Sequence, residues 1–429
     1  MDAYNSAISE LTPLRAEFYT GFRRKKEIFN KKFRPLYLDR ISLLLQYAEK
    51  ISDPVKQQLL FRETLDTLES MKTSEIQDYF QDECMAAIGE KSEDADQADK
   101  GTALIYPFIT EGHPVLLLSL SGNIHYIKVQ ADSQILASCA KRFRRLLERK
   151  EDTDKRPLRY AKYLYEQLIQ PVEQILSASG IDTLVIVPEG ALRLIPFSAL
   201  HDGRQFLIEK YAVATVPALS IAADSPMEKE NILALLSGLS ESRQGFPPLP
   251  NVPEEVMNIQ KITDGSVLQN RNFTLENLSG ALRNTEYTMI HMATHAQFGS
   301  SPEKTFLLTY DGKITPDSLE KLIGLGIFRD NPVDLLTLSA CQTAAEDERA
   351  ILGLAGIALK SGAGSSLSTL WYVDDEAGSV LLTEFYRQLI QKNMSKAKAL
   401  QQAQIKLIGH SSFHHPMYWS PFLLIGNRL

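Results

Sequence analysis

Two short apolar runs, each leading into a reactive side chain, constrain this chain more than any other feature. Residues 287–294 are rich in aromatic and β-branched side chains and lead directly to His295. Residues 334–340 have the same character and lead to Cys341. Runs this short, without polar alternation, are typical of central strands in a parallel sheet that helices cover on both faces. We therefore expect an α/β protein with a doubly wound, mostly parallel sheet.

The ends of these two runs predict where chemistry would take place. In open parallel sheets, ligands collect just beyond the carboxyl ends of the strands. His295 and Cys341 leave two such strands, so we expect them to face each other across one crevice. A thiol and an imidazole placed in this way form a nucleophile and its general base.

The rest of the second part of the chain alternates between strand-like and helix-like segments, which supports this fold class. The strand-like segments are 102–109, 115–120, 124–129, 183–188, 232–236, 365–371 and 422–425. The helix-like segments are 133–150, 158–177, 274–282, 350–361, 376–391 and 396–408. Asp311 and Gly312 form a dipeptide that favours a tight turn, so we expect a hairpin between 306–308 and Ile314.

The N-terminal residues 3–88 have helical patterns throughout. The segment 38–71 resembles one helical hairpin of tetratricopeptide length, but a single hairpin cannot bury its own apolar face. It is either the last unit of a longer array or a helical cap on the domain that follows. The run 92–99 is acidic and poor in apolar residues, so it predicts a linker. The expected parts are a helical region 1–91, a linker 92–100, and two halves of one domain, 101–230 and 231–429.

Other sites that these residue types can form are less well supported. His291 and His295 have the spacing of zinc ligands on a helix, but in a strand four residues span ~13 Å. We therefore expect His291 to be a buried, hydrogen-bonded core histidine. Cys84 and Cys139 have no strand-end setting and are expected to be inert. The chain has no G-x-S-x-G motif for a serine nucleophile, and Gly362 lies after a helix, the reverse of a dinucleotide fingerprint.

Three sequence blocks resemble the signature blocks of the CHAT domain, a caspase-like and separase-like cysteine peptidase fold. The blocks are IHMATHAQF at 290–298, LSACQTA at 338–344 and LWYVDD at 370–375. Segments 187–197 and 415–422 resemble further blocks of the family. With the helical hairpin, the chain is similar to the C-terminal part of a tetratricopeptide–CHAT protein. The resemblance implies that 101–230 is a non-catalytic half and that 231–429 is the catalytic, caspase-like half.

The resemblance also implies roles for individual residues. Cys341 would be the nucleophile of a peptidase, and His295 would protonate the leaving amine and later activate water. The backbone amides of Ala296 and Cys341 would form the oxyanion hole. The family commonly has glycine at the position of Ala296, which keeps the N–H but narrows the allowed backbone angles. No third side chain is evident for orienting His295, so we expect a backbone carbonyl in that role.

The substrate preference is expected to depend on the residues after the last block. In the separase-like branch, an acidic residue here receives a basic substrate side chain. Asp375 matches that position, with Asp374 as the second choice, so the resemblance implies cleavage after Arg or Lys. Both aspartates also fit the start of the helix near Glu376, where they would act as caps. Trp371 and Tyr372 would line the same pocket or belong to the core, and 343–349 would form a mobile lid.

Composition restricts the class of protein. A net charge of −7 disfavours general nucleic-acid binding, and we expect the basic runs 23–34 and 141–150 to be solvated faces of amphipathic helices. The first residues lack a signal-peptide pattern, no run is long enough to span a membrane, and three cysteines are too few for a disulfide framework. We expect a cytoplasmic, bacterial protein without metal or cofactor. It would cut protein substrates when a partner binds its N-terminal helices, or act as a catalytically silent scaffold.

Overall fold

The computed structural model describes residues 4, 10, 29–80, 100–110, 113–149, 155–219, 232–299, 301, 304–323, 333–343, 351–353 and 362–429, with the backbone alone for 340–343. Several expectations from the sequence concern residues outside these described ranges. They are the acidic run 92–99, Cys84, the lid beyond residue 343, and the helix 350–361 except for residues 351–353.

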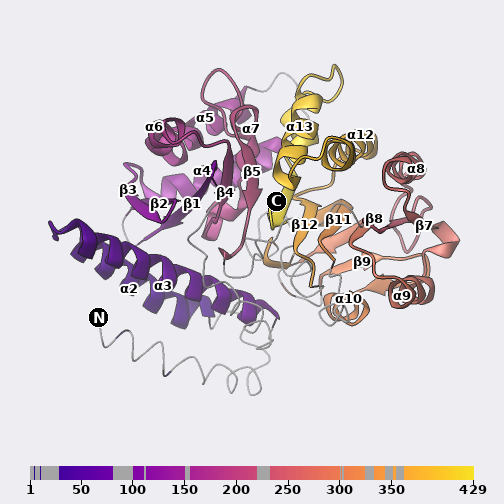
Figure 1. Ribbon diagram of the computed structural model, residues 1–429, viewed down its shortest axis with the longest axis horizontal. Helices are drawn as coiled ribbons and strands as arrows, with labels where there is room; N and C mark the ends of the chain where they lie inside the picture. Colours follow the sequence, from indigo (N-terminus) through magenta and orange to yellow (C-terminus); the bar gives the residue numbers. More distant parts are fainter. Residues whose placement is uncertain are drawn as a thin grey trace.

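In the described part of the chain, one sheet of 13 strands forms the centre, and Figure 1 shows its arrangement. Its first part contains β1 (Thr102–Ile109), β2 (Pro114–Leu120), β3 (Asn123–Lys128), β4 (Thr183–Ile186) and β5 (Ala212–Thr215). Its second part contains β6 (Ala234–Gly238), β7 (Ser266–Gln269), β8 (Met289–Phe298), β9 (Phe306–Leu308), β10 (Lys313–Ile314), β11 (Leu335–Thr343), β12 (Ser365–Thr369) and β13 (Phe422–Gly426). The order is β10-β9-β8-β11-β12-β13-β5-β4-β1-β2-β3, and β6 pairs with both β7 and β8.

Parallel pairing dominates the middle of this sheet. Each strand is parallel to the next in the run β7-β6-β8-β11-β12. The same holds for the run β13-β5-β4-β1. Antiparallel pairs lie toward the edges, in β1-β2-β3 and in β8-β9-β10, and at the junction of β12 with β13. The expected mostly parallel α/β sheet is therefore confirmed. The sheet runs without a break from one half of the chain to the other.

Helices cover both faces of the first part of the sheet. Along β1, Ala103 and Ile105 pack toward α4 (Ser133–Leu147), α5 (Arg156–Leu168) and α6 (Gln170–Ala178). The alternate residues Leu104, Tyr106 and Phe108 pack toward a hairpin of α2 (Arg34–Ala48) and α3 (Pro54–Phe80). The hairpin buries its apolar face on the sheet, so it caps this half of the domain (Figure 1).

The second part of the sheet is also covered on two sides (Figure 1). On one side lie α8 (Val252–Thr263), α12 (Asp375–Tyr386) and α13 (Lys396–Ile408). On the other side lie α9 (Leu275–Asn284) and α10 (Pro316–Ile323). The short helices are α7 (Leu207–Lys210) and α14 (Pro416–Trp419), with 3-10 turns at Gly190–Leu194, Phe197–Ala199 and Asn270–Asn272 and π-helical turns at Phe29–Phe33 and Arg387–Gln391.

Two differences from the expected elements have local causes. The helix expected over 158–177 is two helices, α5 and α6, that meet at Ile169. Pro171 explains the break, because proline lacks the N–H for the helical bond and its ring clashes with the preceding turn. Strand β5 was not expected, because its four small residues are too few for a recognisable pattern. It is nevertheless the strand that joins the two halves, through a parallel pairing of Thr215 with Ile425.

Candidate active site

His295 lies where strand β8 exchanges one neighbour for another. Along one edge of β8, strand β6 pairs with the first residues, up to Ala293. Strand β9 pairs from Ala296 onward. His295 lies between these two pairings, and the segment that follows β6 crosses over its side chain. An exchange of neighbours at the carboxyl ends of parallel strands is where open sheets form crevices.

A bulge sets the position of Cys341 relative to His295. Ala293 pairs with Ser339 and Ala296 pairs with Cys341, so β8 has one residue more than β11 between these pairs. Such bulges break the strict alternation of side chains and re-aim a residue. Because adjacent strands lie about 4.8 Å apart, the backbones of His295 and Cys341 are close neighbours. Both strands continue beyond these residues, so the two sites lie within paired strands and not at the expected strand exits.

A backbone carbonyl holds the imidazole of His295, as expected. Nε2 of His295 lies 2.8 Å from the carbonyl oxygen of Pro247. A carbonyl only accepts hydrogen bonds, so Nε2 carries the proton in the neutral ring and donates it. Nδ1 is then the basic nitrogen. A hydrogen bond of this kind at one ring nitrogen fixes the tautomer of the imidazole and leaves the other nitrogen able to accept a proton.

Aromatic side chains cover the same ring. The ring of Phe246 lies 5.1 Å from His295, and the ring of Tyr372 is stacked on it at 6.3 Å with 13° between the planes. The loop that carries Phe246 is itself anchored, since Gln244 donates to the carbonyl of Gly312 at 3.0 Å. His295 is consequently only 6% exposed. In this conformation the imidazole is covered rather than open to a substrate.

A buried polar network lies beneath the site. Nε2 of His291 is 2.9 Å from Oε1 of Glu255, and its Nδ1 is 3.3 Å from the hydroxyl of Tyr386. That hydroxyl donates to Thr337 at 2.9 Å, and Ser339 donates to Glu255 at 3.4 Å. Burial raises the pKa of Tyr386, so this hydroxyl stays protonated. The network ties α8 and α12 to β8 and β11, and it confirms His291 as a hydrogen-bonded core histidine.

The two aspartates beside the site have different partners. Asp374 is the N-cap of α12 and accepts from the amide of Ala377 at 3.1 Å. Oδ2 of Asp375 accepts from the amide of Asn251, just before α8, at 2.5 Å. Asp375 is half-buried, and burial is the main cause that raises the pKa of its carboxyl, with Glu255 adding repulsion. Both carboxyls therefore have structural partners, and that of Asp375 is held in an environment unfavourable to its charge.

Trp371 and Tyr372 point to different environments. Tyr372 is 45% exposed and lies against His295. Trp371 is 5% exposed, and its Nε1 donates to the carbonyl of Met417 at 3.0 Å. The structure thus brings Tyr372 together with the site and places Trp371 in the core.

A family model decides what kind of domain carries this arrangement. The model described as CHAT domain matches residues 158–427. The chain belongs to the CHAT domain family. The match runs from α5 to just beyond β13, and it includes every expected site residue.

Solved structures agree with the fold of this CHAT protein. Separase of Saccharomyces cerevisiae, in its complex with securin, aligns with a TM-score of 0.55 and 10% identity. The alignment covers 99% of this chain and 37% of the separase chain. Gingipain R, an Arg-specific cysteine proteinase, aligns with a TM-score of 0.42 and 8% identity over 69% of this chain and 75% of its own. The fold of the CHAT protein is therefore similar to that of separase. No curated protein sequence matches this chain.

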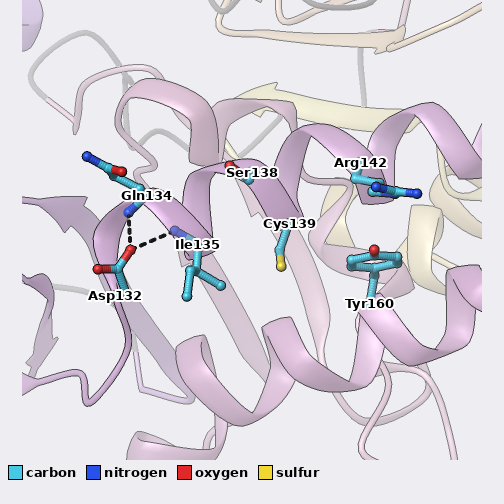
Figure 2. Close-up of a pocket in the computed structure, with 7 residues that line it drawn as sticks. All are labelled: Asp132, Gln134, Ile135, Ser138, Cys139, Arg142 and Tyr160. Atoms are coloured by element: carbon cyan, nitrogen blue, oxygen red, sulfur yellow. Dashed lines mark hydrogen bonds between the residues drawn. The ribbon is translucent and has the colours of Figure 1, made fainter.

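A separate pocket of about 460 Å³ lies on the first half of the CHAT protein (Figure 2). It opens between α4 and α5 and is lined by Asp132, Gln134, Ile135, Ser138, Cys139, Arg142 and Tyr160. Burial raises the pKa of the Cys139 thiol, which opposes formation of a reactive thiolate. None of the lining residues comes from the strands that carry His295 and Cys341. The pocket is therefore not part of the candidate active site.

Two further searches cover the described part of the chain. No helix there is long and apolar enough to cross a membrane. No three His, Cys, Asp or Glu side chains among the described residues are grouped so that they could hold a metal ion.

Sequence reasoning missed the residues that surround the imidazole. Pro247 contributes only a backbone oxygen, which has no signature in side-chain chemistry. Glu255 lies in the first turn of α8, where acids favour the dipole, and its contact with His291 depends on packing between α8 and β8. Phe246 lies in the proline-rich segment 245–250, and nothing in that sequence indicates that its ring lies against His295.

Proposed function

We propose that this CHAT protein is a regulated cysteine endopeptidase that uses Cys341 and His295. The observation that carries the proposal is the imidazole of His295, held through Nε2 by the carbonyl of Pro247, one step before the position opposite Cys341. On β11, Thr337 and Ser339 present hydroxyls to α12 and α8, so the side of the sheet that these helices cover is the proposed side for the reaction.

The chemistry is acyl transfer. The thiolate of Cys341 attacks a peptide carbonyl, the C–N bond breaks, and His295 gives a proton to the departing amine. Water then loses a proton to His295 and attacks the thioester, which releases the acid and restores the thiol. The backbone amides of Ala296 and Cys341 are the proposed donors to the oxyanion, each worth about 3–4 kcal/mol in comparable sites.

A basic residue before the scissile bond is the proposed specificity. Asp375 is near the site through Asn251 and the loop that covers His295, and burial, with added repulsion from Glu255, raises the pKa of its carboxyl. The guanidinium of a substrate Arg or the ammonium of Lys would supply a positive charge that pairs with this carboxyl. Tyr372 would flank the entering side chain, whereas Trp371 supports it from the core.

Control by a protein partner is part of the proposal. His295 is covered by Phe246 and flanked by Tyr372, and Ala296 is 2% exposed, so substrate access requires the loop that carries Phe246 to move. The N-terminal hairpin is the proposed receiver of the partner, because its α3 helix reaches the loop after β8. Separase, whose fold is similar, was solved with securin. We place the protein in a reducing cytoplasm, acting on protein substrates in a stress, defence or signalling response.

The same burial favours one other function. If the cover never opens, the chain is a CHAT scaffold that binds proteins without cutting them. The two functions differ in whether the Cys341 thiol can react with a substrate-like compound.

Covalent labelling separates the two functions. A peptidyl acyloxymethyl ketone with Arg at the terminal position is incubated with the protein, and labelled peptides are located by mass spectrometry. A matched compound with Asp in place of Arg is the specificity control. The peptidase account predicts a label on Cys341 from the Arg compound that His295→Ala abolishes. Equal labelling of Cys341 and of Cys139, unaffected by His295→Ala, would contradict it.

A further inference from the structure

Tyr372 is the exposed ring that stacks on His295, and its place depends on the residue before it. Trp371 and Tyr372 follow β12, where no strand pairing holds the chain. Trp371 anchors this segment, because its ring is buried and its Nε1–H is bonded to Met417. Whatever fixes Trp371 therefore also fixes Tyr372 against the imidazole.

An arginine from the other half of the molecule holds Trp371. Arg144 lies near the end of α4 and is 1% exposed. Its Cζ lies 4.7 Å from the centre of the Trp371 ring, and its Nη2 donates to the carbonyl of Leu370. Its Nε donates to Glu148 at 2.6 Å, which aims the guanidinium. One planar side chain thus contacts both the ring and the backbone of the segment.

These contacts are the kind that fix a position. A cation over an indole face and a charge-assisted hydrogen bond are strongest where water is excluded, as at this buried guanidinium. The guanidinium is planar and rigid, so it restricts the position of this segment more than the flexible ammonium of a lysine would. Burial is the main cause that lowers the pKa of Arg144, with Glu148 opposing it; the guanidinium of arginine keeps its charge in proteins.

We propose that Arg144, supplied by the non-catalytic half, is a positioning residue of the active site. It acts through Trp371 to keep Tyr372 stacked on His295. The inference rests on the proposed Cys341–His295 dyad and goes beyond it, since it gives the first half a role in tuning the reactivity of the second. The half without a nucleophile then completes the site.

The test measures the rate at which iodoacetamide alkylates Cys341 between about pH 5 and pH 9, a range that brackets the usual titration of imidazole and thiol groups. Mass spectrometry of the Cys341 peptide separates this label from those on Cys84 and Cys139. The full chain is used throughout. Melting temperature and near-UV circular dichroism establish that each variant is folded under the assay conditions.

Four variants are compared with the wild type. Arg144→Met removes the cation and keeps much of the apolar bulk. Arg144→Lys keeps the charge without the planar fork. Trp371→Phe keeps a buried ring but loses the bond to Met417, so it carries the test if Arg144→Met does not fold. Arg142→Met is the matched control, because Arg142 is an exposed arginine on the same helix and faces the pocket of Figure 2.

The inference predicts a graded effect. A nearby imidazolium stabilises a thiolate. The His295→Ala variant therefore gives the pH dependence of alkylation for a Cys341 thiol without an imidazole beside it. Arg144→Met and Trp371→Phe are expected to shift the midpoint of the pH profile toward that of His295→Ala, with Arg144→Lys between them and the wild type. At pH 7 the alkylation rate of Arg144→Met should fall on the order of 10-fold, within the ~100-fold that a displacement of ~1 Å can cost. Arg142→Met should superimpose on the wild type.

Two other patterns would overturn the inference, and they differ. If folded Arg144→Met and Trp371→Phe keep the wild-type profile while His295→Ala changes it, Arg144 has only a structural role and the dyad stands. If His295→Ala itself keeps the wild-type profile, both the dyad and the positioning role are rejected.

Discussion

Asp375 accepts a hydrogen bond from Asn251 and is also the proposed partner of a basic substrate side chain, and its substitution separates these two roles. Its raised pKa means that the folded state favours the protonated carboxyl, so its contribution to stability is present at acidic pH and is lost as pH rises through the folded pKa. At pH 7 Asp375→Asn should therefore keep or raise the melting temperature, since its amide oxygen still accepts from Asn251. The gain should shrink as pH falls toward about 4, where aspartate is protonated in the unfolded chain. Labelling by the Arg ketone should be lost.

Asp374→Asn is the matched control for that prediction. Asparagine is as good an N-cap as aspartate, so the bond from Ala377 and the preference for Arg should both survive. A large fall in melting temperature for Asp375→Asn, with the preference for Arg intact, would show that Asp375 is only a structural cap.

Lys72 predicts how the stability of the molecule varies with pH. It is fully buried, and its ammonium donates to the carbonyl of Pro188 at 2.6 Å. Burial and the nearby Arg193 lower its pKa to about 7, against the opposing pull of three glutamates, which are Glu69, Glu75 and Glu189. The folded state therefore releases a proton that the unfolded chain keeps. The contribution of Lys72 to the free energy of unfolding is fully present above the unfolded pKa of ~10.4 and is lost as pH falls toward 7.

Lys72→Met should flatten this dependence. Chemical denaturation at pH 7, 8 and 9 measures the slope, to which one group adds at most about 1.4 kcal/mol per pH unit. Glu75 and Glu189 stay paired with Arg193 and Arg34 in the variant. Lys56→Met, at an exposed lysine of the same helix, should keep the wild-type slope. Identical slopes for Lys72→Met and the wild type would refute this account of Lys72.

Helix α3 connects the N-terminal hairpin to the strand that carries the imidazole. Near its end, the hydroxyl of Tyr79 donates to the carbonyl of Gly299 at 2.8 Å and lies 3.3 Å from Thr305 Oγ1. Gly299 directly follows β8. Any Cβ at Gly353 would lie 2.5 Å from the same hydroxyl, so the packing here is close. The end of α3 is therefore in contact with Gly299, which follows the strand of His295, and with Gly353.

Tyr79→Phe should loosen this connection. Loss of the buried hydrogen bond leaves the carbonyl of Gly299 without its donor, at a cost of about 1–3 kcal/mol in the free energy of unfolding. Hydrogen exchange of residues 296–299 should become faster, because the end of β8 loses an anchor. Tyr47→Phe on α2, whose side chain is exposed, is the control. Unchanged exchange in Tyr79→Phe would mean that the hairpin does not constrain the site.

Elements with a strong local pattern were predictable from sequence. The 306–314 hairpin, the helix 396–408 and the apolar strands all lie where their spacing placed them. Residue contacts that depend on folding were not predictable. The bulge beside His295 lies in the pairing of β8 with β11, beside the point where β9 replaces β6 along the other edge of β8, and the sequence of β8 does not predict either feature. The carbonyl of Pro247 comes near His295 only because β6 directs the following loop across the site.

At the scale of the whole molecule, the two halves share one sheet and one core. The parallel pairing of β13 with β5 continues the sheet, and Arg144 reaches across to Leu370 and Trp371. The order of the strands could not be read from the sequence, because β5 and β13 are short and far apart in the chain. The family blocks predicted the fold class, while the join between halves depends on contacts that only the folded chain makes.

Cleavage of a defined peptide mixture tests the central claim most directly. The wild type, Cys341→Ala and His295→Ala are incubated with the mixture, and new termini are identified by mass spectrometry. The account predicts cuts only with the wild type, and only after Arg or Lys. Cuts that persist in Cys341→Ala or His295→Ala would contradict the proposed dyad.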